Sequence, residues 1–130
     1  MENCKKLSFR MLAGHYAIVR LAPDSAVPNW AIRGEFNSVT RTPEELSIVC
    51  AVQNLPPGIA SPHRWACLKL EGPFPFSMTG VLLSFIQPLS SNQIPIFAIS
   101  TFDTDYVLIQ EEHISAALNR LREAGHEMAP

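Results

Sequence analysis

The stretch Ile94 to Ile109 reads IPIFAISTFDTDYVLI and decides the fold, because two strand-like runs flank a polar turn. Residues 94–100 and 105–109 are rich in β-branched and aromatic residues, which is typical of paired strands. Between them lies the segment Ser100 to Asp105 (STFDTD), which places side-chain oxygens at the adjoining ends of both apolar runs. The stretch therefore predicts a hairpin that carries hydrogen-bond acceptors at its tip.

A strand and a helix are predicted before this hairpin. Trp65 to Glu71 (WACLKLE) is typical of a strand whose apolar residues largely occupy one face. Ser77 is a suitable N-cap, and apolar residues recur at helical spacing from Met78 to Leu89 behind it. Pro88 lacks an N–H group, so we expect it to kink or end this helix within one turn.

A second helix is predicted after the hairpin. Glu111 and Glu112 suit its positive N-terminal end, an apolar stripe runs from Ile114 to Leu121, and Gly125 is a C-terminal stop. His126 to Met128 is expected to form a short closing strand. The order strand, helix, strand, strand, helix, strand predicts an α+β fold of the ferredoxin-like βαββαβ type, with both helices on one face of an antiparallel sheet.

The first part of the chain has strand patterns but no long helix. We expect residues 1–62 to form a degenerate N-terminal half of the same plan and residues 63–130 to form the C-terminal module. The first twelve residues are expected to be a poorly ordered arm or a lead-in to the first strand. The Pro-rich piece from Asn54 to Pro62 is expected to be a connector. The predicted strands of the N-terminal half are Tyr16–Leu21, Gly34–Arg41 and Leu46–Val52.

Composition excludes several classes of function. The chain has 130 residues, a net charge of −2 and a pI near 6.0, so it lacks the basic surface that binds a nucleic-acid backbone. The longest apolar stretch, Gly80 to Ile86, is far shorter than the roughly 20 residues that span a bilayer. The N-terminus is not typical of a secretory signal, so a cytoplasmic location is expected.

No catalytic or metal-binding pattern is present in the sequence. Cys4, Cys50 and Cys67 are widely spaced, with no Cys-x-x-Cys pair and no histidine at zinc-ligand spacing. Motifs for nucleophilic, phosphate-binding or dinucleotide chemistry are also missing. We therefore expect neither an enzyme nor a cofactor. Four histidines are isolated in the sequence and are expected to be ordinary surface or strand-end residues: His15, His63, His113 and His126.

The loop before the first helix offers hydrogen-bond donors that complement the acceptors of the hairpin. Gly72 to Gly80 reads GPFPFSMTG and leads into the exposed N–H groups of a helix N-terminus, which favour a carboxylate. Asp103 or Asp105 would receive an ammonium or guanidinium group. Together the two loops suit a zwitterion such as an amino acid.

Each of these features also has a purely structural interpretation. Ser77 then only caps a helix, Gly80 only eases packing, and Asp103 with Thr104 forms an Asx-type turn. A polar cluster at Arg41, Thr42 and Glu45 is likewise open to two interpretations. It is either a capping box or a group that faces the ligand loops, where Arg41 grips a carboxylate.

Three segments resemble the ACT domain family, specifically the small proteins with two tandem ACT modules that are related to the CASTOR arginine sensors of animal cells. They are Phe36 to Ser47, of which FNSVTRT and ELS carry the similarity, Leu70 to Val81 (LEGPFPFSMTGV) and Phe97 to Ile109 (FAISTFDTDYVLI). The last segment is specific, because a strand run with two Asp and two Thr residues is not a general pattern. The resemblance covers nearly the whole chain from Tyr16.

The resemblance implies a ferredoxin-like fold, paired modules, a homodimer and a small ligand, usually an amino acid, bound at module interfaces. In related sensors the ligand is contacted by the strand-to-helix loop and by the hairpin loop. The matching residues here are Phe76, Ser77, Met78, Thr79, Gly80 and Val81 in the first loop, and Ser100, Thr101, Phe102, Asp103, Thr104 and Asp105 in the second.

The function expected from the resemblance is that of a non-catalytic, allosteric sensor that binds an amino acid and passes its state to a protein partner. The alternative is a structural or oligomerisation module with no physiological ligand.

Overall fold

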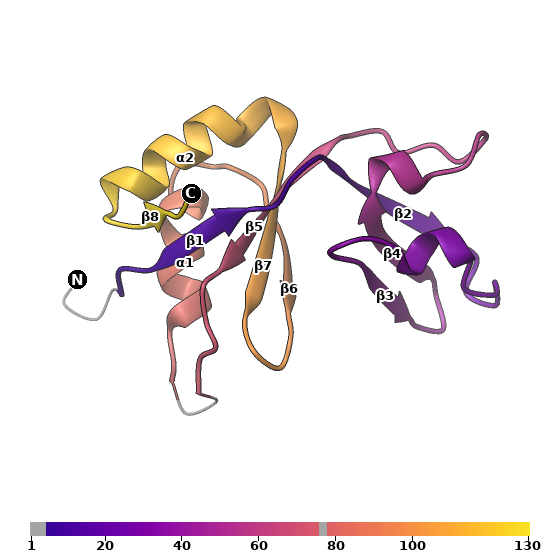
Figure 1. Ribbon diagram of the computed structural model, residues 1–130, viewed down its shortest axis with the longest axis horizontal. Coiled ribbons are helices and arrows are strands. Elements are labelled where there is room, and N and C mark those ends of the chain that lie inside the picture. Colours follow the sequence, from indigo (N-terminus) through magenta and orange to yellow (C-terminus); the bar gives the residue numbers. More distant parts are fainter. Residues whose placement is uncertain (1–4, 76–77) are drawn as a thin grey trace. The chain divides into compact units, whose positions relative to one another are not determined.

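The computed structural model describes residues 5–75 and 78–130, and the chain divides into two compact units (Figure 1). The larger unit consists of Met1–Ala13 together with Ala66–Pro130, and the smaller unit is Gly14–Trp65. The expected division into two ACT-like halves at residues 62 and 63 stays a prediction. The structure adds that the N-terminal segment belongs to the same unit as the C-terminal part of the chain.

The sheet of the larger unit has the strand order β6-β7-β5-β1-β8. The hairpin strands β6 and β7 are antiparallel, β1 is antiparallel to β5, and β8 runs parallel to β1. The order β5, α1, β6, β7, α2, β8 along the chain confirms the predicted ferredoxin-like α+β fold. The elements are β1 (Ser8–Met11), β5 (Trp65–Leu70), α1 (Val81–Ser90), β6 (Phe97–Ser100), β7 (Asp105–Gln110), a short 3₁₀ turn η3 (Glu111–His113), α2 (Ile114–Glu123) and β8 (Glu127–Met128).

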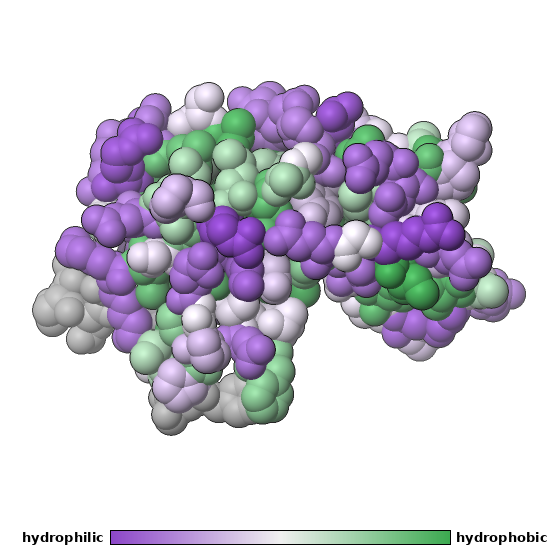
Figure 2. Space-filling model, viewed as in Figure 1, coloured by the Kyte–Doolittle hydropathy of each residue, from purple (hydrophilic) through white to green (hydrophobic). Residues whose placement is uncertain are grey.

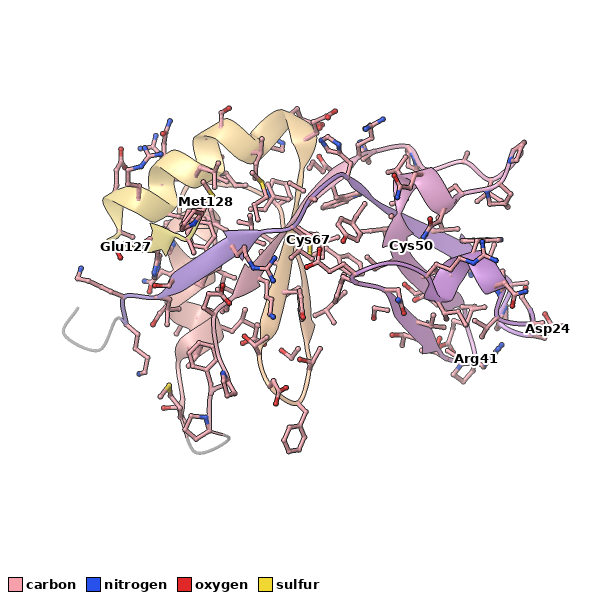
Figure 3. The ribbon with its side chains drawn as sticks, in the orientation of Figure 1. Asp24, Arg41, Cys50, Cys67, Glu127 and Met128 are labelled. Atoms are coloured by element: carbon pink, nitrogen blue, oxygen red, sulfur yellow. The ribbon has the colours of Figure 1, made fainter. Side chains whose placement is uncertain are left out.

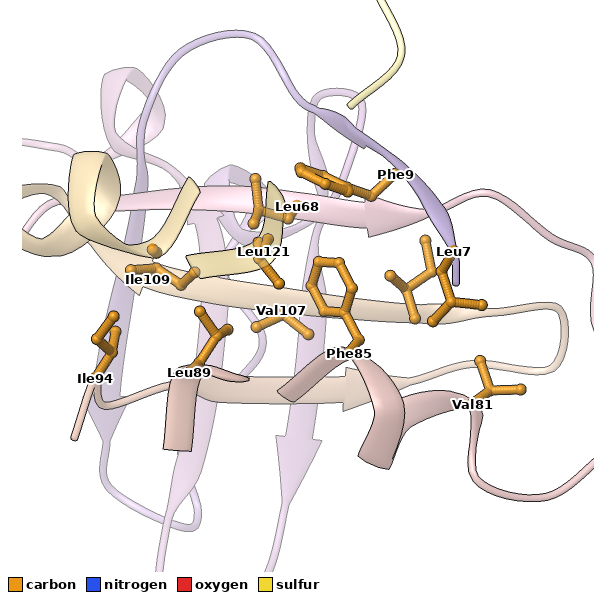
Figure 4. Packing of buried hydrophobic residues seen from close by; sticks show 12 residues of the cluster. Leu7, Phe9, Leu68, Val81, Phe85, Leu89, Ile94, Val107, Ile109 and Leu121 are labelled. Carbon is orange, nitrogen blue, oxygen red and sulfur yellow. The ribbon is translucent and has the colours of Figure 1, made fainter. Parts of the chain in front are cut away.

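The core of the larger unit lies between one face of this sheet and the two helices (Figure 4). Leu68 and Leu70 of β5 are two residues apart, so they share a face, and both are fully buried. Phe85 of α1 packs edge-on against Phe9 of β1, with ring centroids 5.2 Å apart. Fully buried side chains of this size stabilise the fold by about 1.5 to 3 kcal/mol each.

The N-terminal segment is the main correction to the sequence-based prediction. Ser8–Met11 is a strand in the sheet, with Phe9 opposite Leu70 of β5, and it lies between β5 and β8. Leu7 and Phe9 point into the core, with exposed fractions of 9% and 2%, so their burial holds this strand in place. The expectation of a poorly ordered arm is therefore wrong for this strand.

The first helix begins later than predicted. Helix α1 starts at Val81, its N-cap is Gly80 with a φ of 77°, and no side chain caps it. The left-handed backbone of Gly80 cannot continue a helix, so Met78 lies before the helix although it fits the apolar spacing. Ser77, the predicted cap, lies outside the described residues. Pro88 lies inside the helix, which ends at Ser90, as predicted.

Two of the predicted strands are shorter than expected. The first strand of the hairpin starts at Phe97 and not at Ile94, because Pro95 has no N–H group to donate to a neighbouring strand. In the smaller unit, the predicted strand Gly34–Arg41 is limited to Ser38–Arg41. The second helix and the closing strand are confirmed, and Gly125 follows α2 with a φ of 96°.

The smaller unit is a three-stranded antiparallel sheet in the order β3-β4-β2. Its core includes Val19, Ile48 and Cys50, which are almost or completely buried. The turn between β3 and β4 is closed by Thr42, whose hydroxyl oxygen accepts hydrogen bonds from the N–H groups of Glu44 and Glu45. The elements are β2 (Tyr16–Leu21), the 3₁₀ turn η1 (Asn29–Ile32), β3 (Ser38–Arg41), β4 (Leu46–Ala51) and the 3₁₀ turn η2 (Val52–Asn54).

Candidate functional site

The hairpin between β6 and β7 ends in a closed four-residue loop, residues 101–104. The last strand pair is Ser100 opposite Asp105, and the Ser100 hydroxyl donates a hydrogen bond to the Asp105 carboxylate. Within the loop, the Thr101 N–H donates to the Thr104 carbonyl oxygen at 2.8 Å. These bonds fix the shape of the loop and hold the Asp105 carboxylate beside it.

The hairpin loop is joined by hydrogen bonds to the segment that leads from β5 to α1. The Phe74 N–H donates to the Asp103 carbonyl oxygen at 3.0 Å, and the Thr104 hydroxyl donates to the Leu70 carbonyl oxygen at 2.8 Å. Gly72 allows this close approach, because a Cβ atom at that position would lie 3.0 Å from the Asp103 carbonyl oxygen. The two loops therefore form one connected structure.

A hollow of about 220 Å³ lies where the two loops meet, and we call it the loop hollow. It brings together two segments that α1 and β6 separate in the sequence, which is the meeting that the amino-acid-binding hypothesis requires. The lining residues are Phe74, Pro75, Met78, Val81, Ser100, Thr101, Phe102, Asp103, Thr104 and Asp105.

Most of the predicted site residues line the loop hollow. All six from the hairpin do so, together with Met78 and Val81 of the first loop. Thr79 and Gly80 are described by the structure but do not line it, and Phe76 and Ser77 lie outside the described residues. Phe74 and Pro75 line it as well, although the predicted set did not include them.

The helix N-terminus beside the loop hollow carries an additional positive charge. The Lys5 ammonium nitrogen lies 3.8 Å from the point where a Cβ atom on Gly80 would be, at the start of α1. The main-chain N–H of Lys5 donates to the Ser84 hydroxyl oxygen at 3.0 Å, which anchors the residue there. A cation is unfavourable at the positive end of a helix dipole, so this position favours an anion. The sequence prediction missed Lys5, because it treated the first twelve residues as a poorly ordered arm or a lead-in to the first strand.

The hairpin supplies the opposite charge. Asp103 is exposed and Asp105 is half-buried, and both line the loop hollow. Carboxylates that line the hollow, together with the N-terminus of α1, which reaches it at Val81, are complementary to the ammonium and carboxylate groups of a zwitterion.

Metal-binding clusters and reactive cysteines are the other chemistry to consider. Among residues 5–75 and 78–130, no three His, Cys, Asp or Glu side chains are placed to hold a metal ion. Cys50 and Cys67 are buried and form no disulfide within the described part of the chain, and burial raises the pKa of the Cys50 thiol, which keeps it protonated and unreactive at neutral pH (Figure 3). Over the same described ranges, no helix is long and apolar enough to cross a membrane.

Arg41, the cationic member of the polar cluster in the smaller unit, binds the chain that follows β2. Its guanidinium donates hydrogen bonds to the carbonyl oxygens of Pro23 and Ser25 (Figure 3). Two of its five N–H groups thus hold the turn around Asp24. These contacts give Arg41 a structural role within the smaller unit.

Comparison with known proteins agrees with this fold. A family model described as an ACT domain matches residues 60–123, and a second model described as an N-terminal domain matches residues 14–58. Protein Atu0741 from Agobacterium tumefaciens, known from a crystal structure, is 41% identical with a TM-score of 0.88, over 96% of this chain and 93% of that chain. A Vibrio cholerae protein of unknown function, VC0802, is 21% identical with a TM-score of 0.73 over 92% and 91% of the two chains, and it shows the fold alone.

Curated relatives include proteins named cytosolic arginine sensor for mTORC1 subunit 1. The cattle protein (Bos taurus) is 27% identical and the human protein (Homo sapiens) 26%, each over 75% of this chain. The match covers 35% of each relative, so this chain spans about a third of their length. The residues matched by the ACT model include both loops of the hollow, and the chain belongs to the ACT domain family, in a group related to the cytosolic arginine sensors.

Proposed function

We propose that this protein is a non-catalytic regulatory module that binds a free amino acid in the loop hollow. The observation that carries the proposal is the meeting of the two predicted loops around one hollow of about 220 Å³. The relationship to proteins named arginine sensors supports the same class of ligand.

The charges around the hollow suggest how the ligand is oriented. Its carboxylate lies at the N-terminal end of α1, where helix N–H groups and the Lys5 ammonium favour an anion. Its ammonium group lies toward the hairpin, where Asp103 and Asp105 accept charge-assisted hydrogen bonds. Both charged ends of the ligand are then satisfied by the chain.

Regulation requires that the ligand prefers one conformation or assembly of the protein over another. The ligand contacts two loops, which the Phe74–Asp103 and Thr104–Leu70 hydrogen bonds join. Ligand binding would therefore favour the arrangement of the loops in which both hydrogen bonds are intact. We include in the proposal a homodimer in the cytosol and a partner protein that reads the ligand-bound state.

The test is a thermal-shift and calorimetry screen with the twenty amino acids. At least one should bind, while its carboxamide and its N-acetyl derivative, which each lack one charge, should bind at least about tenfold more weakly. Asp103→Asn and Asp105→Asn should weaken binding of the intact amino acid. Glu44→Gln, on an exposed turn of the smaller unit, is the matched control.

Two results contradict the proposal. One is that no amino acid raises the melting temperature or gives a binding heat, and a ligand-independent dimer would then favour the oligomerisation module. The other is a confirmed ligand whose affinity is unchanged in both aspartate variants.

A further inference from the structure

A second hollow adjoins the loop hollow and has a different chemical character. It measures about 310 Å³, and we call it the apolar hollow. It shares Phe74, Pro75, Phe102 and Asp103 with the loop hollow, so one ligand can occupy both. Among the described residues, the apolar hollow is lined in addition by Pro73.

The walls of the apolar hollow offer few polar groups. The described residues that line it are Asp103 and four proline and phenylalanine residues, namely Pro73, Phe74, Pro75 and Phe102. Neither proline has an N–H group, and the Phe74 N–H already donates to the Asp103 carbonyl oxygen. A polar ligand group placed here would lose its water without gaining a main-chain N–H donor from these three residues.

We infer that the ligand is an amino acid with an apolar side chain, which occupies the apolar hollow while its charged ends occupy the loop hollow. This inference rests on the proposed function and names the substrate class for the same site. Apolar pocket walls with a few polar groups at one end are typical of sites for small ligands of this kind.

Phe102 is the residue that decides this preference. It lies at the tip of the hairpin, its side chain is 77% exposed, and it lines both hollows. Figure 2 shows a hydrophobic area at this end of the larger unit. An exposed aromatic side chain beside a hollow gains from covering an apolar ligand, because both lose contact with water.

Aspartates and aromatic rings near the site also suit a competing ligand. In the alternative arrangement the ligand is arginine, and its guanidinium group stacks on Phe102 and pairs with Asp103. Norleucine and lysine separate the two possibilities, since they have the same four-carbon side chain and differ in that lysine ends in an ammonium group.

The experiment measures the affinity of the full chain for alanine, norleucine, leucine, phenylalanine, lysine and arginine by calorimetry. Norleucine should bind at least about tenfold more tightly than alanine, because additional side-chain carbons are removed from water. It should also bind at least about tenfold more tightly than lysine, whose ammonium group would lose its water in the apolar hollow. Phe102→Ala should weaken norleucine binding more than alanine binding, and so reduce the ratio of norleucine to alanine affinity severalfold. Leu83→Ala is the control, since Leu83 is 62% exposed on α1 and lines neither hollow.

Tighter binding of arginine or lysine than of norleucine overturns the inference and leaves the proposed function intact. Equal affinities for alanine and norleucine, or a norleucine preference that survives Phe102→Ala, overturn it as well. Absence of binding by all six amino acids overturns the inference, whereas the proposed function fails only if none of the twenty amino acids binds, so the two failures give different results.

Discussion

The hydroxyl group of Thr104 donates a hydrogen bond of 2.8 Å to the main-chain carbonyl oxygen of Leu70, across 34 positions of sequence. Thr104 is only 7% exposed, although it lies in a loop. The bond ties the hairpin loop to the end of β5, where the strand-to-helix segment begins. It therefore supports both the fold of the larger unit and the shape of the loop hollow.

Thr104→Val should destabilise the protein by about 1 to 3 kcal/mol, because it leaves the buried Leu70 carbonyl oxygen without its donor while preserving the side-chain shape. Thr104→Ser retains the hydroxyl and should recover most of this loss. Urea unfolding followed by circular dichroism measures both variants. Thr40→Val, on an exposed position of β3, is the control and should stay within about 0.5 kcal/mol of the wild type. Equal stabilities of the Val and Ser variants at position 104 would show that the bond is unimportant.

Gly72→Ala should weaken amino-acid binding, because the new Cβ atom would lie 3.0 Å from the Asp103 carbonyl oxygen and 3.1 Å from the Phe74 nitrogen. The two loops must separate to admit it, at a cost of about 1 to 3 kcal/mol in stability. Gly14→Ala is the matched control. Gly14 has a φ of 76° and no atoms within 4 Å of the added Cβ, so this variant loses about 1 kcal/mol to backbone strain and keeps its ligand affinity. Calorimetry on both variants separates a binding effect from a stability effect, and unaltered binding by Gly72→Ala would contradict the prediction.

The element order of the larger unit was predictable from sequence because its signals are local. The apolar stripe of α2, the stop at Gly125 and the alternation in β5 each lie within about ten residues. The position of β1 was not predictable in this way. Leu7 and Phe9 form too short a pattern, and what fixes their strand is long-range pairing with β5 and β8.

For the candidate site, too, local sequence patterns pointed to some residues, whereas features that depend on contacts or backbone conformation were missed. The hairpin loop was singled out by its unusual number of side-chain oxygens, the resemblance to the ACT family implied its six residues, and the structure brings all of them to one hollow. The sequence did not reveal that Lys5 lies at the start of α1 or that this helix begins only after its N-cap, Gly80. The place of Lys5 depends on the Ser84 contact 79 positions away, and the start of α1 depends on the left-handed backbone of Gly80.

His126 joins three segments of the larger unit and has a pKa that burial lowers. Its Nδ1 accepts a hydrogen bond from the Leu7 N–H at 3.1 Å, so Nε2 carries the proton and donates to the Ser84 carbonyl oxygen at 2.9 Å. The side chain is 3% exposed. Burial is the main cause of the lowered pKa, the hydrogen bond to Ser84 acts in the opposite direction, and the nearby Lys6 charge lowers it further.

The stability of the protein should therefore fall as the solution is acidified below about pH 6.5, the ordinary pKa of histidine. Above that pH both states hold a neutral imidazole, and the contribution of His126 is fully present. Below it the unfolded state binds a proton more readily than the folded state, and the loss continues down to the lowered pKa of the folded protein. Urea unfolding between pH 7.5 and 5 measures this slope, which His126→Gln should reduce and the control His113→Gln should preserve. An unchanged slope in the His126 variant would contradict the assignment.

Lys5→Gln should have opposite effects on binding and on stability. The Lys5 ammonium lies at the positive end of α1, so without ligand its removal relieves an unfavourable charge and leaves stability unchanged or slightly higher. With ligand, the carboxylate loses a cation, and amino-acid affinity should fall about two- to fivefold, with a smaller effect at high salt. Lys6→Gln, the adjacent lysine, whose ammonium lies near Gly125, should leave affinity unchanged. Calorimetry at two salt concentrations together with urea unfolding tests the prediction, and equal affinities of the wild type and the Lys5 variant would show that the carboxylate does not bind at this end of the helix.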